Sequence, residues 1–203
     1  MTPLAELILQ IRSIMDLDPD NLTDPYDKYL DLGKIERVDR ETLETHRQLP
    51  EHDPFLELSS LLQQYIRLHR LEHLYVGLNE LFKIYLLLIT PRNQEYLTRQ
   101  VWQVIETLVH YSLKTEYPYT ARFWNYLSNC AEPVLVFIID QSYLKAAKNT
   151  LKCLMELSHM AVRAGLHTSK LQHTLRVVEL KCSEYSHSEL LAIAEEYRQN
   201  MEV

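Results

Sequence analysis

Glycine is scarce in this chain, which has only 3 glycines in 203 residues alongside 46% hydrophobic residues. Tight hairpins, β-bulges and phosphate-binding loops use glycine because it alone reaches positive φ without steric cost. The scarcity therefore argues against a hairpin-rich β protein and against glycine-rich nucleotide loops. It predicts an all-α protein whose helices are joined by short turns of Pro, Asn, Asp and Ser.

The chain also has few cysteines and no long apolar run. The three cysteines, Cys130, Cys153 and Cys182, are widely spaced and form no CxxC pair, which argues against a disulfide framework or a structural zinc site. The longest uncharged apolar runs, 84–89 and 134–139, are far shorter than the roughly 18 residues of a membrane span. No signal peptide is visible at the N-terminus, so we expect a cytoplasmic protein.

The net charge of −7 is distributed unevenly. Residues 16–57 contain thirteen acidic and five basic side chains, whereas residues 145–181 contain seven basic and only two acidic ones. Four prolines also fall in the acidic region. We therefore expect an acidic N-terminal helical arm or lobe over residues 1–52 and a helical repeat or bundle domain over residues 53–203. The acidic balance and the lack of a strong basic motif argue against nucleic-acid binding.

Apolar residues recur at helical spacing through most of the sequence. A short amphipathic helix is expected near the N-terminus, and one long helix, or two joined near Gly77, over residues 55–89. Further helices are predicted at 93–114, 118–130, 133–163 (broken near Asp140), 168–183 and 186–201.

A short internal match is compatible with a helical repeat. Residues 93–97 (NQEYL) and 140–144 (DQSYL) agree at an offset of 47 residues, and this period is typical of HEAT or armadillo units. Shared helix starts that match by chance are the alternative. The expected architecture is all-α, with antiparallel helices in a short HEAT-like solenoid or an irregular bundle.

His69, Glu72 and His73 form an H-x-x-E-H pattern. On one helix, histidines four residues apart share a face, and a neighbouring glutamate can activate a metal-bound water. This pattern is compatible with a zinc-type site in a metal-dependent helical protein, a hydrolase or a metal binder, but such a site requires a third ligand from elsewhere in the chain. The alternative is a polar helix face carrying two histidines and i±4 charge pairs.

An acidic stretch near the N-terminus resembles a calcium-binding loop. Its acidic side chains fall at positions 1, 3, 5, 9 and 12 of an EF-hand-like loop; they are Asp16, Asp18, Asp20, Asp24 and Asp27. The glycine expected at position 6 and the bidentate glutamate at position 12 are absent. A calcium-responsive domain and an acidic turn that caps helices are both consistent with the pattern.

Two groups of residues are candidates for binding a partner. Lys145, Lys148 and Lys152 lie along one predicted helix face beside an apolar stripe. A solvated flank is the usual interpretation of such a stripe, and the alternative hypothesis is that it docks an acidic partner, which includes this chain's own acidic N-terminal lobe. The second group is the aromatic turn with Tyr117, Tyr119 and Trp124, in which Tyr and Trp suit an interface or a core corner. We expect Tyr117 and Tyr119 to be the most exposed of its aromatic side chains.

No nucleophile elbow and no glycine-rich phosphate loop occurs in the sequence. The leading hypothesis is a non-enzymatic protein-interaction or regulatory domain that needs no cofactor and binds a protein partner or itself. The apolar stripe over residues 61–89 is compatible with a dimer, and the sequence leaves the oligomeric state open. The metal-dependent and the calcium-responsive protein remain the alternatives.

Overall fold

The computed structural model describes residues 54–201. The predicted arm and the EF-hand-like loop therefore lie outside the described residues. Within 54–201 all regular secondary structure is helical, so the all-α prediction is confirmed there. The helices are α3 (Pro54–Arg67), α4 (Leu71–Leu88), α5 (Gln94–Lys114), α6 (Thr120–Asp140), α7 (Leu144–Arg163), α8 (Ser169–Glu184) and α9 (Ser188–Met201).

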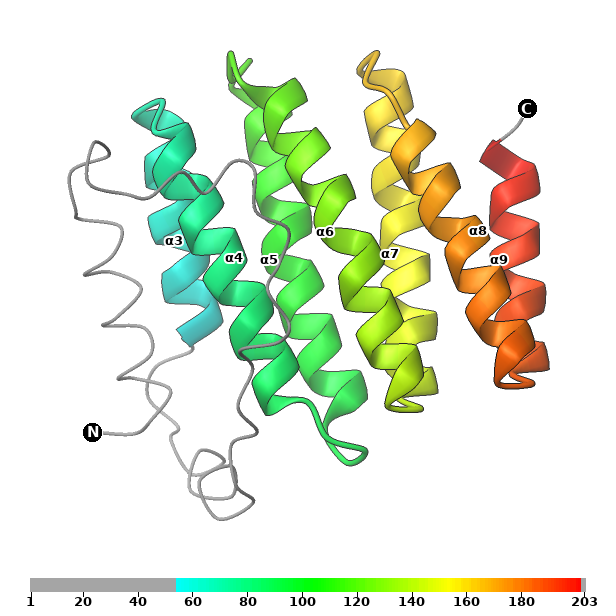
Figure 1. Ribbon diagram of the computed structural model, residues 1–203. Helices are drawn as coiled ribbons and strands as arrows, with labels where there is room; N and C mark the ends of the chain where they lie inside the picture. Colours follow the sequence, from blue (N-terminus) through cyan, green and yellow to red (C-terminus); the bar gives the residue numbers. More distant parts are fainter. Residues whose placement is uncertain (1–53, 202–203) are drawn as a thin grey trace. The chain divides into compact units, whose positions relative to one another are not determined.

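The chain divides into two compact units. The described part of the first comprises residues 54–88 and 103–120, and that of the second comprises residues 89–102 and 121–201. In the first unit α3 packs against α4. In the second unit α6 to α9 alternate in direction, with α6 and α8 in one layer and α7 and α9 in the other (Figure 1). Helix α9 contacts both α7 and α8.

Five turns between consecutive helices close in the same way. Each places one residue at φ between 50° and 73°; these residues are His69, Glu116, Ser142, Gly165 and Ser186. After α7, Gly165 N–H donates to Val162 O at 3.0 Å and Leu166 N–H donates to Ala161 O at 2.8 Å. This pair of bonds is the Schellman motif, which satisfies carbonyls that a helix end leaves without partners. The other four turns have the same pair.

The α4–α5 turn closes differently. Thr90 N–H donates to Asn93 Oδ1 at 2.7 Å, and Asn93 N–H donates to Thr90 Oγ1 at 3.3 Å. This reciprocal arrangement is that of a capping box. Pro91, between them, has the fixed φ that suits a first helical position. Here the start of the following helix is specified by side chains.

Two helix boundaries differ from the predicted ones. The 55–89 region is broken at 68–70, where His69 adopts positive φ, and α4 continues through the buried Gly77. Helix α6 also continues through Pro133, where we predicted a new helix. An internal proline costs a helix about 3 kcal/mol, and burial of apolar side chains on both sides of Pro133 offsets this. The predicted break near Asp140 is confirmed.

The core of each unit is formed by apolar helix faces. In the first unit Leu78, Phe82 and Tyr85 are fully buried, so these members of the 61–89 stripe offer no surface to a second copy. In the second unit the buried Trp102 donates its indole N–H to Thr150 Oγ1 at 3.1 Å, which joins α5 to α7. None of the helices described combines the length and apolarity needed to cross a membrane.

The turns generate a prediction about stability. Glu116→Gly and Ser142→Gly should each raise the free energy of unfolding by about 0.5 kcal/mol or more, because left-handed φ costs an L-residue roughly 1–2 kcal/mol and glycine almost none. The measurement is urea denaturation.

The matched control is Gly165→Ala, where an added Cβ meets nothing within 4 Å. Its cost is therefore conformational, and we expect a loss of about 1 kcal/mol. Equal midpoints for all three variants and the parent would contradict this account of the turns.

Candidate functional site

A groove in the second unit is the candidate site. It has a volume of about 580 Å³, which lies within the usual range of ligand-binding clefts. It is formed where α5, α7 and α9 begin, and we call it the α5–α7–α9 groove. Charged, polar and apolar side chains line it together: Glu95, Leu144, Lys145, Lys148, Asn149, Ser186, His187, Ser188, Glu189, Leu190 and Ile193.

Two ion pairs cross the groove wall and join neighbouring helices. Lys145 Nζ lies 3.1 Å from Glu95 Oε2, and Lys148 Nζ lies 2.7 Å from Glu189 Oε1. All four side chains are more than half exposed. Exposed pairs contribute little to stability, because water and salt screen them. The charges therefore remain available to a molecule that enters the groove.

The second pair is close enough to shift the pKa values of both partners. Its hydrogen bond and charge raise the pKa of the Lys148 ammonium and lower the pKa of the Glu189 carboxyl. Glu189 also lies in the first turn of α9, where the helix dipole favours a negative charge. Because the pKa of Glu189 is lowered in the folded state, the pair is complete above the ordinary glutamate pKa and is lost on acidification through the lowered value.

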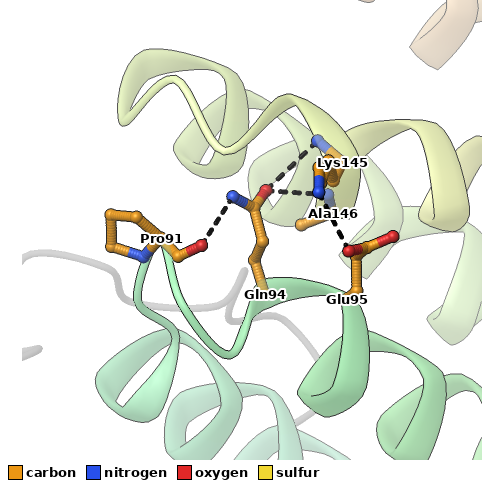
Figure 2. A network of polar contacts seen from close by, with 5 residues as sticks. All are labelled: Pro91, Gln94, Glu95, Lys145 and Ala146. Atoms are coloured by element: carbon orange, nitrogen blue, oxygen red, sulfur yellow. Dashed lines mark hydrogen bonds and ion pairs between the residues drawn. The ribbon is translucent and has the colours of Figure 1, made fainter.

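Gln94 fixes the start of α7 beside the groove (Figure 2). Its Oε1 accepts hydrogen bonds from the backbone N–H groups of Lys145 and Ala146, both at 3.1 Å, and its Nε2 donates to Pro91 O at 3.1 Å. Tyr143, the N-cap residue of α7, supplies no side-chain cap. A residue of α5 therefore satisfies two amides that α7 leaves without intrahelical acceptors.

The α9 side of the groove presents polar atoms and apolar surface. Ser188, Glu189 and Leu190 carry the first amides of α9, which an α-helix leaves without intrahelical acceptors. His187 Nε2 is buried and has no hydrogen-bond partner among the described residues. Ile193 on α9 is half-buried, and Leu144 across the groove is 38% exposed. The groove can therefore contact both charged and apolar groups.

The structure separates the lysines that we predicted as one stripe. Lys145 and Lys148 line the groove, whereas Lys152 is exposed on α7 outside the groove lining. Two further lysines of the basic region pair with acids on α6: Lys170 with Glu132 at 3.4 Å and Lys181 with Asp140 at 3.2 Å. The basic residues of 145–181 thus serve largely to join helices.

The aromatic turn is mostly part of the core. Tyr117 is only 4% exposed, so the expectation that it is exposed is wrong, and Tyr119 is half-buried. Burial is the largest cause that raises the pKa of the Tyr117 hydroxyl. Trp124 is 2% exposed and donates its indole N–H to His167 O at 2.8 Å. The dense aromatic sequence reflects packing and turn anchoring.

The H-x-x-E-H residues do not share a helix face. His69 lies in the α3–α4 turn at φ 57°, whereas Glu72 and His73 lie in α4. The His69 ring packs edge-on to Tyr117 at 6.0 Å, and the His73 ring stacks on Tyr65 at 5.0 Å. The helix geometry assumed for the zinc-type site is therefore wrong. Across residues 54–201, no three His, Cys, Asp or Glu side chains are grouped to hold a metal ion.

Sequence reasoning missed Glu95, Glu189 and Gln94. Their partners lie 50, 41 and 51 residues away along the chain. No local spacing rule connects residues so far apart. The usable signal was the basic excess of residues 145–181, for which acidic side chains on other helices are natural partners.

Comparisons with protein-family models, with curated proteins and with solved structures gave no match to this chain.

Removal of the Gln94 cap should destabilise the start of α7. We expect Gln94→Ala to lower the free energy of unfolding by about 1 kcal/mol, the usual cost of losing a helix cap, and to speed hydrogen exchange at the Lys145 and Ala146 amides. Gln103→Ala, an exposed position on the same helix, is the matched control. Equal exchange in the two variants would contradict the capping role.

The Lys148–Glu189 pair can be tested by titration. In Lys148→Gln the pKa of Glu189 should rise toward its ordinary value, because the hydrogen bond and charge that lower it are gone. Carbon-13 NMR of the glutamate carboxyl measures this pKa directly. Lys152→Gln should leave it unchanged. An unaltered Glu189 titration in Lys148→Gln would show that the pair does not form in solution.

Proposed function

We propose that this chain is a non-enzymatic protein-interaction domain of the cytosol, built as a short HEAT-like array of antiparallel helices. Its binding surface is the α5–α7–α9 groove, which receives a segment of a partner protein. One observation carries the proposal: three helix starts converge on one groove that presents exposed charges beside apolar side chains. Protein-binding grooves combine these same two kinds of group.

The helix arrangement supports the repeat part of the proposal. In a helical repeat protein each unit contacts mainly its neighbours, and equivalent helices lie in the same layer. The alternation of α6 and α8 with α7 and α9 agrees with this (Figure 1), as does the recurrence of one turn type. The equivalent helices α5, α7 and α9 begin at residues 94, 144 and 188, so the spacing is uneven and differs from the exact offset of 47.

The ionic and polar contacts within the second unit support a binding role over a hydrolytic one. The groove lysines face carboxylates of neighbouring helices, an arrangement that presents exposed charge at the groove. The sequence also contains no nucleophile elbow and no phosphate loop. Packed helices that present a groove with both charged and apolar side chains are typical of interaction modules.

Site-specific photo-crosslinking tests the proposal. A benzophenone amino acid in place of Asn149, which lines the groove, should give discrete adducts with a protein partner in the cells that make this protein. The same amino acid in place of His159, exposed elsewhere on α7, is the matched control. Adducts that appear equally at both positions, or at neither, would contradict the groove as the interaction surface.

A further inference from the structure

Helices α7 and α9 begin in the same way, so their first residues can be compared one by one. Each start follows a serine at positive φ, at 60° before α7 and 58° before α9. The next residues, Tyr143 and His187, both donate their backbone N–H to the carbonyl five residues earlier, and both carbonyl oxygens accept the first helix bond at 3.0 Å. Residues 144–146 of α7 therefore correspond to residues 188–190 of α9.

The two helix starts differ in what accepts from their first amides. At α7, Gln94 Oε1 accepts from the amides of Lys145 and Ala146, both at 3.1 Å. The corresponding amides of α9 belong to Glu189 and Leu190, and no residue of 54–201 accepts from either. Ala146 and Leu190 are both buried, so burial of the side chain leaves the amide open to a cap. The α9 start thus lacks the cap that α7 has.

The residue at the position of this missing cap is apolar. Gln94 is the first residue of α5, and the equivalent first residue of α7 is Leu144, whose side chain has no acceptor atom. Leu144 is 38% exposed and lines the α5–α7–α9 groove together with Glu189 and Leu190. A molecule in the groove can therefore approach the position that Gln94 occupies one helix pair earlier.

The charges around the groove favour a neutral ligand. Each of its two lysines already pairs with a groove glutamate. The C-terminal ends of α6 and α8 lie next to the starts of α7 and α9, so the opposite partial charges of these helix ends offset one another. A side-chain amide supplies the acceptor oxygen that the α9 amides need and adds no net charge. It is also the group that Gln94 uses at α7.

We infer that the groove binds an uncharged segment of a partner protein that carries a glutamine, and that this glutamine caps α9. Its side-chain oxygen accepts from the Glu189 and Leu190 amides, as Gln94 Oε1 does from the equivalent amides of α7. Apolar side chains of the segment pack on Leu144 and Ile193, which line the groove and are partly exposed. The inference rests on the proposed function and specifies the chemistry of the partner segment.

Hydrogen exchange in the full chain tests whether the α9 cap is open. Leu144→Gln places a side-chain amide at the first residue of α7, as in α5, and should slow exchange of the Glu189 and Leu190 amides about five-fold, the factor that corresponds to a typical helix cap. Leu144→Met, matched in size but without an amide, should leave both amides unchanged. Equal exchange in the two variants would show that the helix starts are not equivalent and would overturn the inference.

Fluorescence anisotropy tests the ligand. The probe is a labelled pool of heptapeptides with a central glutamine between two leucines, and control pools have methionine, glutamate or lysine in place of the glutamine. The glutamine pool should bind about five-fold more tightly than the methionine pool. Added salt should preserve this ratio, because the cap involves no charged side chain. Tighter binding of the glutamate or the lysine pool would contradict a neutral ligand and overturn the inference.

Three variants connect the binding to the start of α9. Leu144→Gln fills the cap from within the chain, so it should reduce binding of the glutamine pool to the level of the methionine pool. Leu144→Met should keep the preference for glutamine. Lys148→Met should also keep it, with affinities changed by less than about two-fold, because the contact is to backbone amides. Loss of the preference in Lys148→Met, or its survival in Leu144→Gln, would count against the cap and overturn the inference.

The outcomes also distinguish this inference from the proposed function. Equal binding of the glutamine and methionine pools, or failure of every pool to bind, would overturn the glutamine ligand. Groove-specific crosslinks at position 149 would in that case leave the interaction groove standing. The absence of such crosslinks would overturn the proposed function as well.

Discussion

The helix ends impose the constraint on which the described structure depends. Each α-helix leaves carbonyls without partners at its C-terminus, and five turns satisfy them with the same two backbone hydrogen bonds. The motif reverses the chain within a few residues, so consecutive helices of the same unit become antiparallel neighbours. Four of the five turns place a non-glycine residue at positive φ. These positions cost conformational free energy, and burial of the apolar helix faces offsets that cost.

In the second unit, buried polar contacts and surface ion pairs join the helices in different places. Trp102 and Thr150 join α5 to α7 by a buried hydrogen bond, in which specificity comes from a polar contact between two buried side chains. At the surface, lysines of α7 and α8 pair with acids on α5, α6 and α9. Four of the seven basic residues in 145–181 are therefore paired with acidic side chains of other helices.

Sequence periodicity predicted most helices closely, because an amphipathic stripe and its boundaries are local properties. The predicted helix breaks were wrong where the preference of a single residue competed with packing. Pro133 predicted a helix start, but burial on both sides keeps α6 continuous. Gly77 predicted a break, whereas the chain turns at His69, a residue with no strong turn signal. Of the candidate site, Lys145 and Lys148 were predicted. Glu95 and Glu189 were not, because their contacts span 50 and 41 residues.

The sequence by itself determined the helical class, the approximate helix boundaries and the uneven charge, since composition and periodicity act over a few residues. Tertiary structure alone decided which charged residues face the groove, which tyrosine is buried and which side chain caps α7. These outcomes depend on how helix faces far apart in the chain meet. Because the chain has so few glycines, four of the five left-handed turn positions described are occupied by other residues. Packing determined which residues these are.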